Sequence, residues 1–503
     1  MQTPGATEAG VDNPRSPGHQ RPCPAATPSG SASLIERLTS GNQRLDEILH
    51  GGLLQNAINL FIGVPGSGKT ILSQQYTFYN ATLERPALFL STVTEPLDKI
   101  IRYGQSLDFF DPAAIRDRRV IYEDLGDILT RDGFGPSDRA VFAEVLEAID
   151  TFLKELHPGI VVIDSFKAFH AFAKNENEFR HFLHGLIRRL TAIATTTIWN
   201  APYTLAQAQE VAEFAAADGV ISLDIQHRDG RELRVLQVLK LRGSGFLSGE
   251  HAYRISTAGL DVFPRLADHQ DTSAYELSTD RVATGVPALD TMLGEGYWAG
   301  SSTLICGPSG VGKTLMGLHF IFQGARTGQP GILATFQETE NQLARIVKGF
   351  GWSLDEQGVH ILSRSVVDMY IDEWVYELLN FIEKTGAKRI VIDSLVDLMV
   401  TAGDPLRFRE WMYSLVQRCA RRGISLMMIV EVPELFQLRR ISEQGLSHLS
   451  DNVVLLQYVQ DGSRLARAIT VLKTRAAHHE PVAHRYEIAA TGLVLGDEIA
   501  LER

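Results

Sequence analysis

The feature that most constrains the fold of this chain is an internal repeat, because several blocks of sequence return later in the same order. The matching segments are 40–46 (SGNQRLD) with 284–290 (TGVPALD), 63–70 (GVPGSGKT) with 307–314 (GPSGVGKT), 161–165 (VVIDS) with 390–394 (IVIDS), and 240–242 (KLR) with 473–475 (KTR). Segments that keep their order while the loops between them change length are typical of a duplicated domain. The sequence therefore predicts two copies of one domain.

The length and composition agree with two folded domains. The chain has 503 residues, of which 44% are hydrophobic and 21% charged, and this is enough apolar material for two cores. Residues 1–32 are rich in Pro, Gly, Ser and Ala without an apolar period, which predicts a disordered N-terminal tail. The polar stretch 267–280 is expected to be a linker. We therefore predict domains at 33–266 and 281–497 and a short C-terminal tail at 498–503.

Each copy carries the motif G-x-x-x-x-G-K-[ST] between a short apolar run and a segment of helical period. Strand, glycine loop and helix together form the context in which this motif cradles phosphates through backbone N–H groups. The lysine reaches the β- and γ-phosphates, and the following threonine supplies a hydroxyl to Mg²⁺. The residues predicted to bind ATP are Gly63, Gly66, Ser67, Gly68, Lys69 and Thr70 in the first copy and Gly307, Ser309, Gly310, Val311, Gly312, Lys313 and Thr314 in the second.

One aspartate in each copy ends a run of β-branched residues. Asp164 and Asp393 are expected at the carboxyl ends of buried parallel strands, where open α/β sheets bind their ligands. We predict that they hold Mg²⁺ together with Thr70 and Thr314. The predicted fold is α/β: two tandem RecA-like P-loop NTPase domains, each a mostly parallel twisted sheet flanked by helices.

Two glutamates are candidates for the hydrolytic step. Glu95 and Glu338 follow the next strand at equivalent positions of the two copies. A carboxylate there is suited to orient the attacking water or to accept its proton. The alternative is a carboxylate that only stabilises the start of a helix through the helix dipole.

Two cations near the end of each copy are further catalytic candidates: Lys240 and Arg242 in the first, and Lys473 and Arg475 in the second. Because they end strand-like runs, their side chains are suited to neutralise charge on the γ-phosphate of a neighbouring molecule. The alternative is a solvated strand end that pairs with surface carboxylates.

The composition also argues against several classes of protein. A net charge of −12 does not favour a surface that binds nucleic acid, since that binding depends on Lys and Arg contacts to phosphates. The longest apolar stretches, such as 424–430, are far shorter than the roughly 18 residues of a membrane span. The three cysteines (Cys23, Cys306 and Cys419) are too few for a disulfide framework or a zinc site. We therefore expect a cytoplasmic protein without a metal other than Mg²⁺.

These motifs together resemble the KaiC family, two-domain RecA-type ATPases and autokinases of the cyanobacterial clock. The resemblance rests on the T-G-x-x-x-L-D element, the phosphate loop, the strand ending in Asp-Ser and the Lys-x-Arg element, and it extends over about residues 34–496. It implies a homohexameric double ring with ATP held between subunits. It also implies that Lys240, Arg242, Lys473 and Arg475 reach the nucleotide of the next subunit, and that the protein has signalling partners whose identity the sequence does not give.

The sequence departs from the family pattern in two ways. KaiC-type domains usually carry two adjacent glutamates, whereas here the pairs are Thr94-Glu95 and Gln337-Glu338, so we expect slower or differently tuned hydrolysis. The phosphorylated Ser-Thr pair of the family's second domain corresponds to Ser447-His448, which leaves Ser447 as the candidate phosphorylation site. The chain stops at Arg503, soon after the second domain, so we expect neither the family's long C-terminal tail nor a true oscillator.

The leading functional hypothesis is an ATP-hydrolysing signalling protein with a candidate Ser/Thr autokinase activity in the second domain. One alternative is a DNA-dependent motor or recombinase on the same fold, because fold alone does not separate these activities. Another is an ATP-binding scaffold with little turnover.

Overall fold

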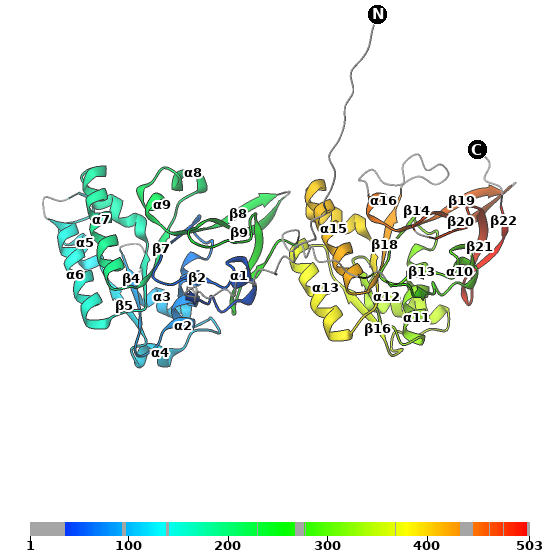
Figure 1. Ribbon diagram of the computed structural model, residues 1–503, viewed down its shortest axis with the longest axis horizontal. Coiled ribbons are helices and arrows are strands. Elements are labelled where there is room, and N and C mark those ends of the chain that lie inside the picture. Colours follow the sequence, from blue (N-terminus) through cyan, green and yellow to red (C-terminus); the bar gives the residue numbers. More distant parts are fainter. Residues whose placement is uncertain are drawn as a thin grey trace, which may run out of the picture. The chain divides into compact units, whose positions relative to one another are not determined.

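The structure, a computed structural model, describes residues 36–92, 97–136, 140–228, 230–266, 276, 278–367, 369–432, 446–461, 463–475 and 477–499. The predicted tail at 1–32 and most of the predicted linker at 267–280 lie outside these ranges. Within them, we find no helix that combines the length and the apolar character of a membrane span. Figure 1 shows the two repeats as two α/β domains.

The first domain is built on a nine-stranded sheet with the order β11-β10-β9-β8-β3-β7-β6-β4-β5. Its strands are β3 (Ile58–Ile62), β4 (Ala87–Ser91), β5 (Val120–Asp124), β6 (Ile160–Asp164), β7 (Thr196–Ala201), β8 (Gly219–Arg228), β9 (Arg231–Leu241), β10 (His251–Ser256) and β11 (Gly259–Phe263). Six neighbouring strands, from β8 to β5, run parallel, and β9 to β11 continue the sheet antiparallel. A short pair, β1 (Arg37–Leu38) and β2 (Leu53–Leu54), lies apart from this sheet.

Helices cover both faces of this sheet because side chains alternate along each strand. On β3, Leu60 packs with residues of α6 and α7, whereas Phe61 packs with residues of α1 and α2. The helices are α1 (Gln43–Ile48), α2 (Lys69–Asn80), α3 (Leu97–Gly104), α4 (Pro112–Arg116), α5 (Gly126–Thr130), α6 (Val141–Leu156), the 3-10 helix η1 (Phe166–Phe172), α7 (Glu176–Ala192), α8 (Leu205–Ala208) and α9 (Ala212–Ala216). With both faces covered, β3, β4 and β7 are buried along their whole length.

The second domain repeats this plan on a sheet with the order β16-β15-β17-β18-β14-β19-β20-β21-β22. Its strands are β14 (Ser302–Gly307), β15 (Gly331–Thr335), β16 (Val359–Ser363), β17 (Arg389–Asp393), β18 (Ser425–Glu431), β19 (Asn452–Asp461), β20 (Arg464–Thr474), β21 (Ala483–Ala489) and β22 (Gly492–Glu498), with the separate pair β12 (Arg281–Val282) and β13 (Tyr297–Trp298). Its helices are α10 (Pro287–Met292), α11 (Lys313–Arg326), α12 (Glu340–Gly349), α13 (Ile371–Thr385), α14 (Leu395–Ala402), α15 (Pro405–Arg421) and α16 (Leu446–Leu449).

The two sheets have the same connectivity. Read from the antiparallel edge, β22-β21-β20-β19-β14-β18-β17-β15-β16 corresponds strand for strand to β11-β10-β9-β8-β3-β7-β6-β4-β5. In both sheets the strand of the phosphate loop and the strand of the aspartate are separated by one strand, β7 or β18. The predicted fold class, two tandem α/β domains with mostly parallel sheets, is confirmed.

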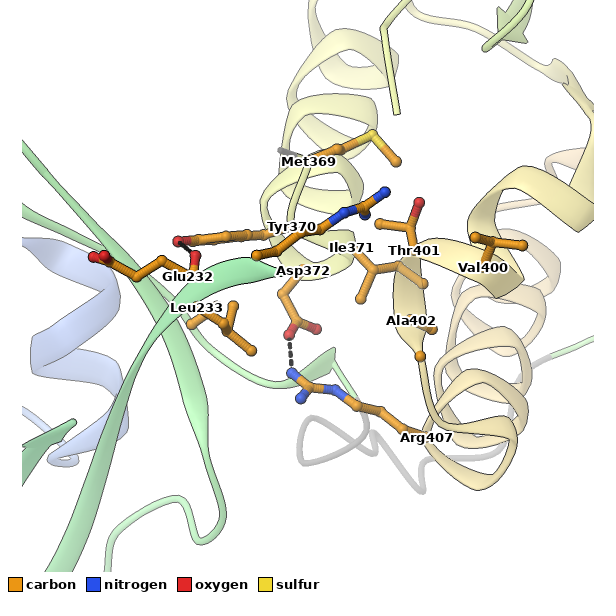
Figure 2. Close-up of a pocket in the computed structure, with 13 residues that line it drawn as sticks. Glu232, Leu233, Met369, Tyr370, Ile371, Asp372, Val400, Thr401, Ala402 and Arg407 are labelled. Carbon is orange, nitrogen blue, oxygen red and sulfur yellow. Dashed lines mark hydrogen bonds and ion pairs between the residues drawn. The ribbon is translucent and has the colours of Figure 1, made fainter. Parts of the chain in front are cut away.

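A buried ion pair joins two helices of the second domain. Asp372, near the start of α13, and Arg407, in the first turn of α15, approach to 2.6 Å, as the dashed line in Figure 2 shows. Their side chains are only 3% and 18% exposed, so loss of one partner would leave a buried charge without compensation. The pair therefore ties α15 to α13.

A polar side chain clamps each phosphate-loop helix to its domain. In the second domain, His319 of α11 donates from Nδ1 to the carbonyl of Gly285 at 3.1 Å, and its Nε2 accepts from the N–H of Leu493 at 2.9 Å. This tautomer follows from the partners, since a carbonyl only accepts and an amide N–H only donates. In the first domain, Gln75 makes the same two kinds of bond, with Ser40 and Leu260.

The His319 clamp requires a neutral ring, which predicts acid sensitivity. Burial lowers the pKa of His319 to about 4, below the roughly 6.5 of an unfolded histidine. The unfolded chain therefore takes up the proton first, and the stabilisation present above pH 6.5 is lost as the pH falls toward 4. Between pH 7.5 and 4.5, we expect the unfolding free energy of the second domain to fall by about 2–3 kcal/mol more in the wild type than in His319→Gln. Urea unfolding of both proteins at pH 7.5 and 4.5 measures this difference; an equal loss in both would contradict it.

Candidate nucleotide-binding sites

The two phosphate loops have the same backbone conformation. The second and third glycines of each motif have positive φ: +80° at Gly66, +95° at Gly68, +75° at Gly310 and +109° at Gly312. Glycine adopts this conformation without steric cost. The last of them directly precedes the helix, which begins at Lys69 or Lys313, and it has no side chain to cap the first N–H groups. These N–H groups, at the positive end of the helix dipole, form a site suited to an anion.

A tyrosine from the antiparallel hairpin supports each loop. The hydroxyl of Tyr253 donates to the carbonyl of Ser67 at 2.6 Å, and the hydroxyl of Tyr486 donates to the carbonyl of Val311 at the same distance. All four side chains are buried. The two bonds fix the loop from the side of β10 and β21, an arrangement that the local motif does not reveal.

The two lysines fold back onto their own loops. The Nζ atom of Lys69 donates to the carbonyls of Gly63 and Val64 at 2.8 and 2.9 Å, and that of Lys313 donates to the carbonyl of Pro308 at 2.8 Å. Burial lowers the pKa of Lys69 to about 8 and also lowers the pKa of Lys313. A nearby anion favours the charged form of a lysine, so both ammonium groups are placed to gain from a polyphosphate.

The threonine and the aspartate of each copy lie in contact. The Oγ1 atom of Thr70 donates to Oδ2 of Asp164 at 2.6 Å, and the Oγ1 atom of Thr314 donates to Oδ2 of Asp393 at 2.6 Å. Burial raises the pKa of Asp393 to about 6, and the charge of Glu338 adds to this shift. Hydroxyl and carboxylate oxygens are the donors that Mg²⁺ prefers, so this pair fits the metal together with phosphate oxygens.

One of the two predicted catalytic glutamates is described by the structure. Glu338 is half-buried and accepts a bond from Oγ1 of Thr335 at 2.9 Å. Thr335 pairs with Asp393 in the sheet register, so Glu338 lies at the same edge of the sheet as Asp393 and the phosphate loop. Its predicted counterpart, Glu95, lies outside the described residues.

The four predicted cations lie near the amino-terminal ends of β3 and β14, whereas the phosphate loops follow the carboxyl ends of these strands. Arg242 pairs with Asp218 at 3.4 Å, and the carboxylate of Asp218 accepts from the N–H of Ile58, the first residue of β3. Lys240 donates to the carbonyls of Phe214 and Ala215 in α9. Because the phosphate loop leaves β3 at its opposite end, these cations do not approach the loop of their own domain.

The second domain repeats this arrangement. Arg475 pairs with Asp451 at 3.5 Å, and Asp451 accepts from the N–H of Ser302, the first residue of β14. Lys473 donates to the carbonyls of Ser447 and Ser450 at 2.9 and 2.6 Å. The predicted phosphorylation site therefore lies beside these cations, on α16, and away from the phosphate loop of its own domain.

Two residues at the sites were not predicted from the sequence. Asn200 lies on β7, and its Nδ2 atom donates to Oδ2 of Asp164 at 2.9 Å. Glu431 ends β18, and its carboxylate is 3.5 Å from Nζ of Lys313. Neither belongs to a segment that repeats. The signal that would have found them is the sheet order, because β7 and β18 lie between the loop strand and the aspartate strand.

A cavity opens beside the first phosphate loop. Its volume is about 620 Å³, within the range of small-molecule sites. Its lining includes Thr70 and Gln74 of α2, Tyr103 and Leu107, and Ile255 of β10. The cavity therefore continues from the anion site to a partly apolar wall suited to a nucleoside.

The fold and the two phosphate loops define the class of this protein as a tandem P-loop ATPase of RecA-like fold. A sequence model of the family described as "ATPase: KaiC" matches residues 38–267 and again residues 282–499. The chain therefore belongs to the KaiC family of ATPases, and the resemblance drawn from the sequence motifs is confirmed.

Individual relatives align along nearly the whole chain. The "Circadian clock oscillator protein KaiC" of Picosynechococcus sp. is 26% identical over 483 residues, which cover 94% of this chain and 92% of the relative. The protein of the same name from Prochlorococcus marinus is 27% identical over 488 residues, covering 95% and 96%. "Circadian clock oscillator protein KaiC 1" of Synechocystis sp. is 26% identical over 471 residues, covering 91% and 88%.

Proposed function

We propose that each domain binds ATP with Mg²⁺ and hydrolyses it to ADP and phosphate. The observation that carries this proposal is the same cluster in both domains: a glycine loop at a helix start, a buried lysine, and a threonine 2.6 Å from an aspartate. Loop N–H groups and the lysine would hold the β- and γ-phosphates, while the threonine and the aspartate would hold Mg²⁺. The metal, when bound, supplies positive charge that stabilises the charge developing on the phosphates.

Glu338 is the proposed water-orienting residue of the second site. It lies beside Asp393, where the γ-phosphate end of a nucleotide on Lys313 would be. By equivalence, Glu95 is proposed for the first site. Orientation of the water and acceptance of its proton are the tasks that these carboxylates would perform.

We propose that the protein assembles as a homohexamer with ATP between subunits. This proposal is supported by the position of the four cations, which lie at the ends of the strands opposite the phosphate loops of their own domains. From those ends, Lys240 and Arg242, like Lys473 and Arg475, can complete a nucleotide site only in a neighbouring subunit. Nucleotide state would then control contacts between subunits and, through them, binding of protein partners.

A second activity, Ser/Thr autophosphorylation at Ser447, is proposed for the second domain. The observation that favours it is the contact of the Ser447 carbonyl with Lys473, one of the cations that would face a neighbour's γ-phosphate. The threonine of the family's phosphorylated pair is His448 here. We therefore propose an ATP-driven signalling protein of the cytoplasm without the two-site phosphorylation of the clock proteins.

The proposal is tested by incubating wild type, Lys69→Ala and Lys313→Ala with Mg-ATP while ADP release, phosphoprotein mass and native mass are measured. Each variant is expected to bind nucleotide about 100-fold more weakly in its own domain, since it loses a charged hydrogen bond to phosphate, and the double variant is expected to release no ADP. Assembly of the wild type without ADP release would favour the ATP-binding scaffold. Stimulation of ADP release by added single-stranded DNA would favour the DNA-dependent motor. Absence of protein-bound phosphate would remove only the kinase, and absence of Mg-ATP binding would refute the proposal.

A further inference from the structure

A buried chain of hydrogen bonds stands behind the predicted Mg²⁺ carboxylate of the first domain. The hydroxyl of Ser73, on α2, donates to Oδ1 of Asn200 at 2.8 Å and also has the carbonyl of Lys69 within reach at 3.0 Å. Nδ2 of Asn200 then donates to Oδ2 of Asp164 at 2.9 Å. Ser73 and Asn200 are both fully buried. The chain therefore connects the phosphate-loop helix to the aspartate strand beneath the site.

The sheet register explains why Asn200 reaches the carboxylate. Asn200 pairs with Asp164 of β6 on one side and with Phe61 of β3 on the other. Because a carboxylate only accepts hydrogen bonds, the amide must present its NH₂ group to Asp164 and its oxygen to Ser73. Oδ2 of Asp164 thus receives two donors, the Thr70 hydroxyl and the Asn200 amide. Two donors from different directions fix the orientation of the carboxylate.

The second domain lacks this support. Its positions equivalent to Ser73 and Asn200, read from the offsets of the two repeats, are Gly317 and Ile429. Neither residue has a side chain that donates a hydrogen bond, so the orientation of Asp393 depends on Thr314. The two sites therefore share the residues that would touch Mg²⁺ and differ in the residues behind them.

We propose that Asn200, oriented by Ser73, is a positioning residue for the Mg²⁺ carboxylate of the first domain, and that its absence makes the second domain the weaker Mg²⁺-nucleotide site. This inference rests on the proposed function. Partners of metal ligands hold the ligand in its binding geometry, and loss of one costs about 10- to 100-fold in metal affinity or activity. Asn200 does not contact the nucleotide loop, so nucleotide binding without metal should not depend on it.

The test uses Lys313→Ala protein, in which the second site is expected to bind about 100-fold more weakly, and a fluorescent ADP analogue as the probe. Asn200→Asp keeps the size of the side chain but replaces the donor with an acceptor. We expect it to raise the Mg²⁺ concentration for half-maximal binding about 10- to 100-fold, while the affinity measured in EDTA stays within about twofold. Ser73→Ala, which leaves the amide in place but removes its anchor, is expected to give a smaller shift in the same direction.

A gain-of-support variant gives a second test, because a folding defect cannot lower a Mg²⁺ requirement. In Lys69→Ala protein, Ile429→Asn is expected to lower the Mg²⁺ requirement of the second site; Gly317 is kept, because a Cβ at that position would lie 2.8 Å from Val391. An Asn200→Asp protein with an unchanged Mg²⁺ requirement, or with an equal loss of affinity in EDTA, would overturn this inference alone. Failure of the Lys313→Ala parent to bind the ADP analogue with Mg²⁺ would overturn the proposed function as well.

Discussion

Replacement of Arg475 by Ala is expected to lower ATP turnover in the second domain by about 10³-fold or more, the effect of losing a cation that neutralises the transition state of phosphoryl transfer. Arg475 lies at the strand ends opposite Lys313, so in the proposed assembly it would act on the nucleotide of a neighbouring subunit. Its side chain is 55% exposed, pairs with Asp451 at the surface and donates to the carbonyl of His448 at 2.9 Å, so it would exchange these exposed contacts for a nucleotide. Arg242, 58% exposed and paired with Asp218, is expected to act in the same way in the first domain.

A mixing experiment separates this role from a structural one. In a Lys69→Ala background, Arg475→Ala and Lys313→Ala proteins are each expected to show no turnover. Dissociated and reassembled together, they should regain it at roughly a quarter of the interfaces, those where an intact lysine faces an intact arginine. Arg475→Lys, which keeps the charge without the planar fork, serves as the control for folding. Mixed rings that stay inactive would show that Arg475 does not act between subunits.

The sequence predicted the parts of the site that are local or repeated. The glycine loop and its helix are contiguous, so the octapeptide at 63–70, repeated in register at 307–314, predicted a glycine loop that leads into a helix. Asp164 and Asp393 were predictable because a run of β-branched residues identifies a buried strand, and the carboxyl ends of parallel strands share one edge. The contacts of Thr70 and Thr314 with these aspartates follow from that rule and from the helix start.

The parts that escaped prediction depend on strand order. Ser73 and Asn200 are distant in sequence and come together because β7 enters the sheet between β3 and β6. No local pattern distinguishes Asn200 from another polar residue in an apolar strand. Likewise, the pairing of Lys313 with Glu431 depends on β18, and the first copy has Pro202 at that position. The repeat itself conceals such differences, because only shared residues stand out when the two copies are compared.

The departure from the family's glutamate pair also has a structural explanation in the second domain. Gln337 replaces the first glutamate, and its Nε2 atom donates to the carboxylate of Asp397 at 3.2 Å. Asp397 in turn accepts from the hydroxyl of Ser394, next to Asp393. A glutamate at position 337 would face Asp397 with like charge, so the amide suits this neighbourhood. Glu338 is therefore the carboxylate of the pair that we propose for the hydrolytic step.

Replacement of Glu338 by Gln is accordingly expected to lower the turnover of the second domain by about 10²- to 10⁴-fold, the usual contribution of a positioned general base. Binding of Mg-ATP should change little, because glutamine has the same size and its oxygen can still accept from Thr335. Single-turnover hydrolysis in Lys69→Ala protein isolates the second site. Gln337→Ala is the matched control and should change the rate only a few-fold. If Glu338→Gln hydrolyses ATP at the parent rate, Glu338 serves only the start of α12, and the base must be sought among the other carboxylates of this sheet edge, where Glu431 already contacts Lys313.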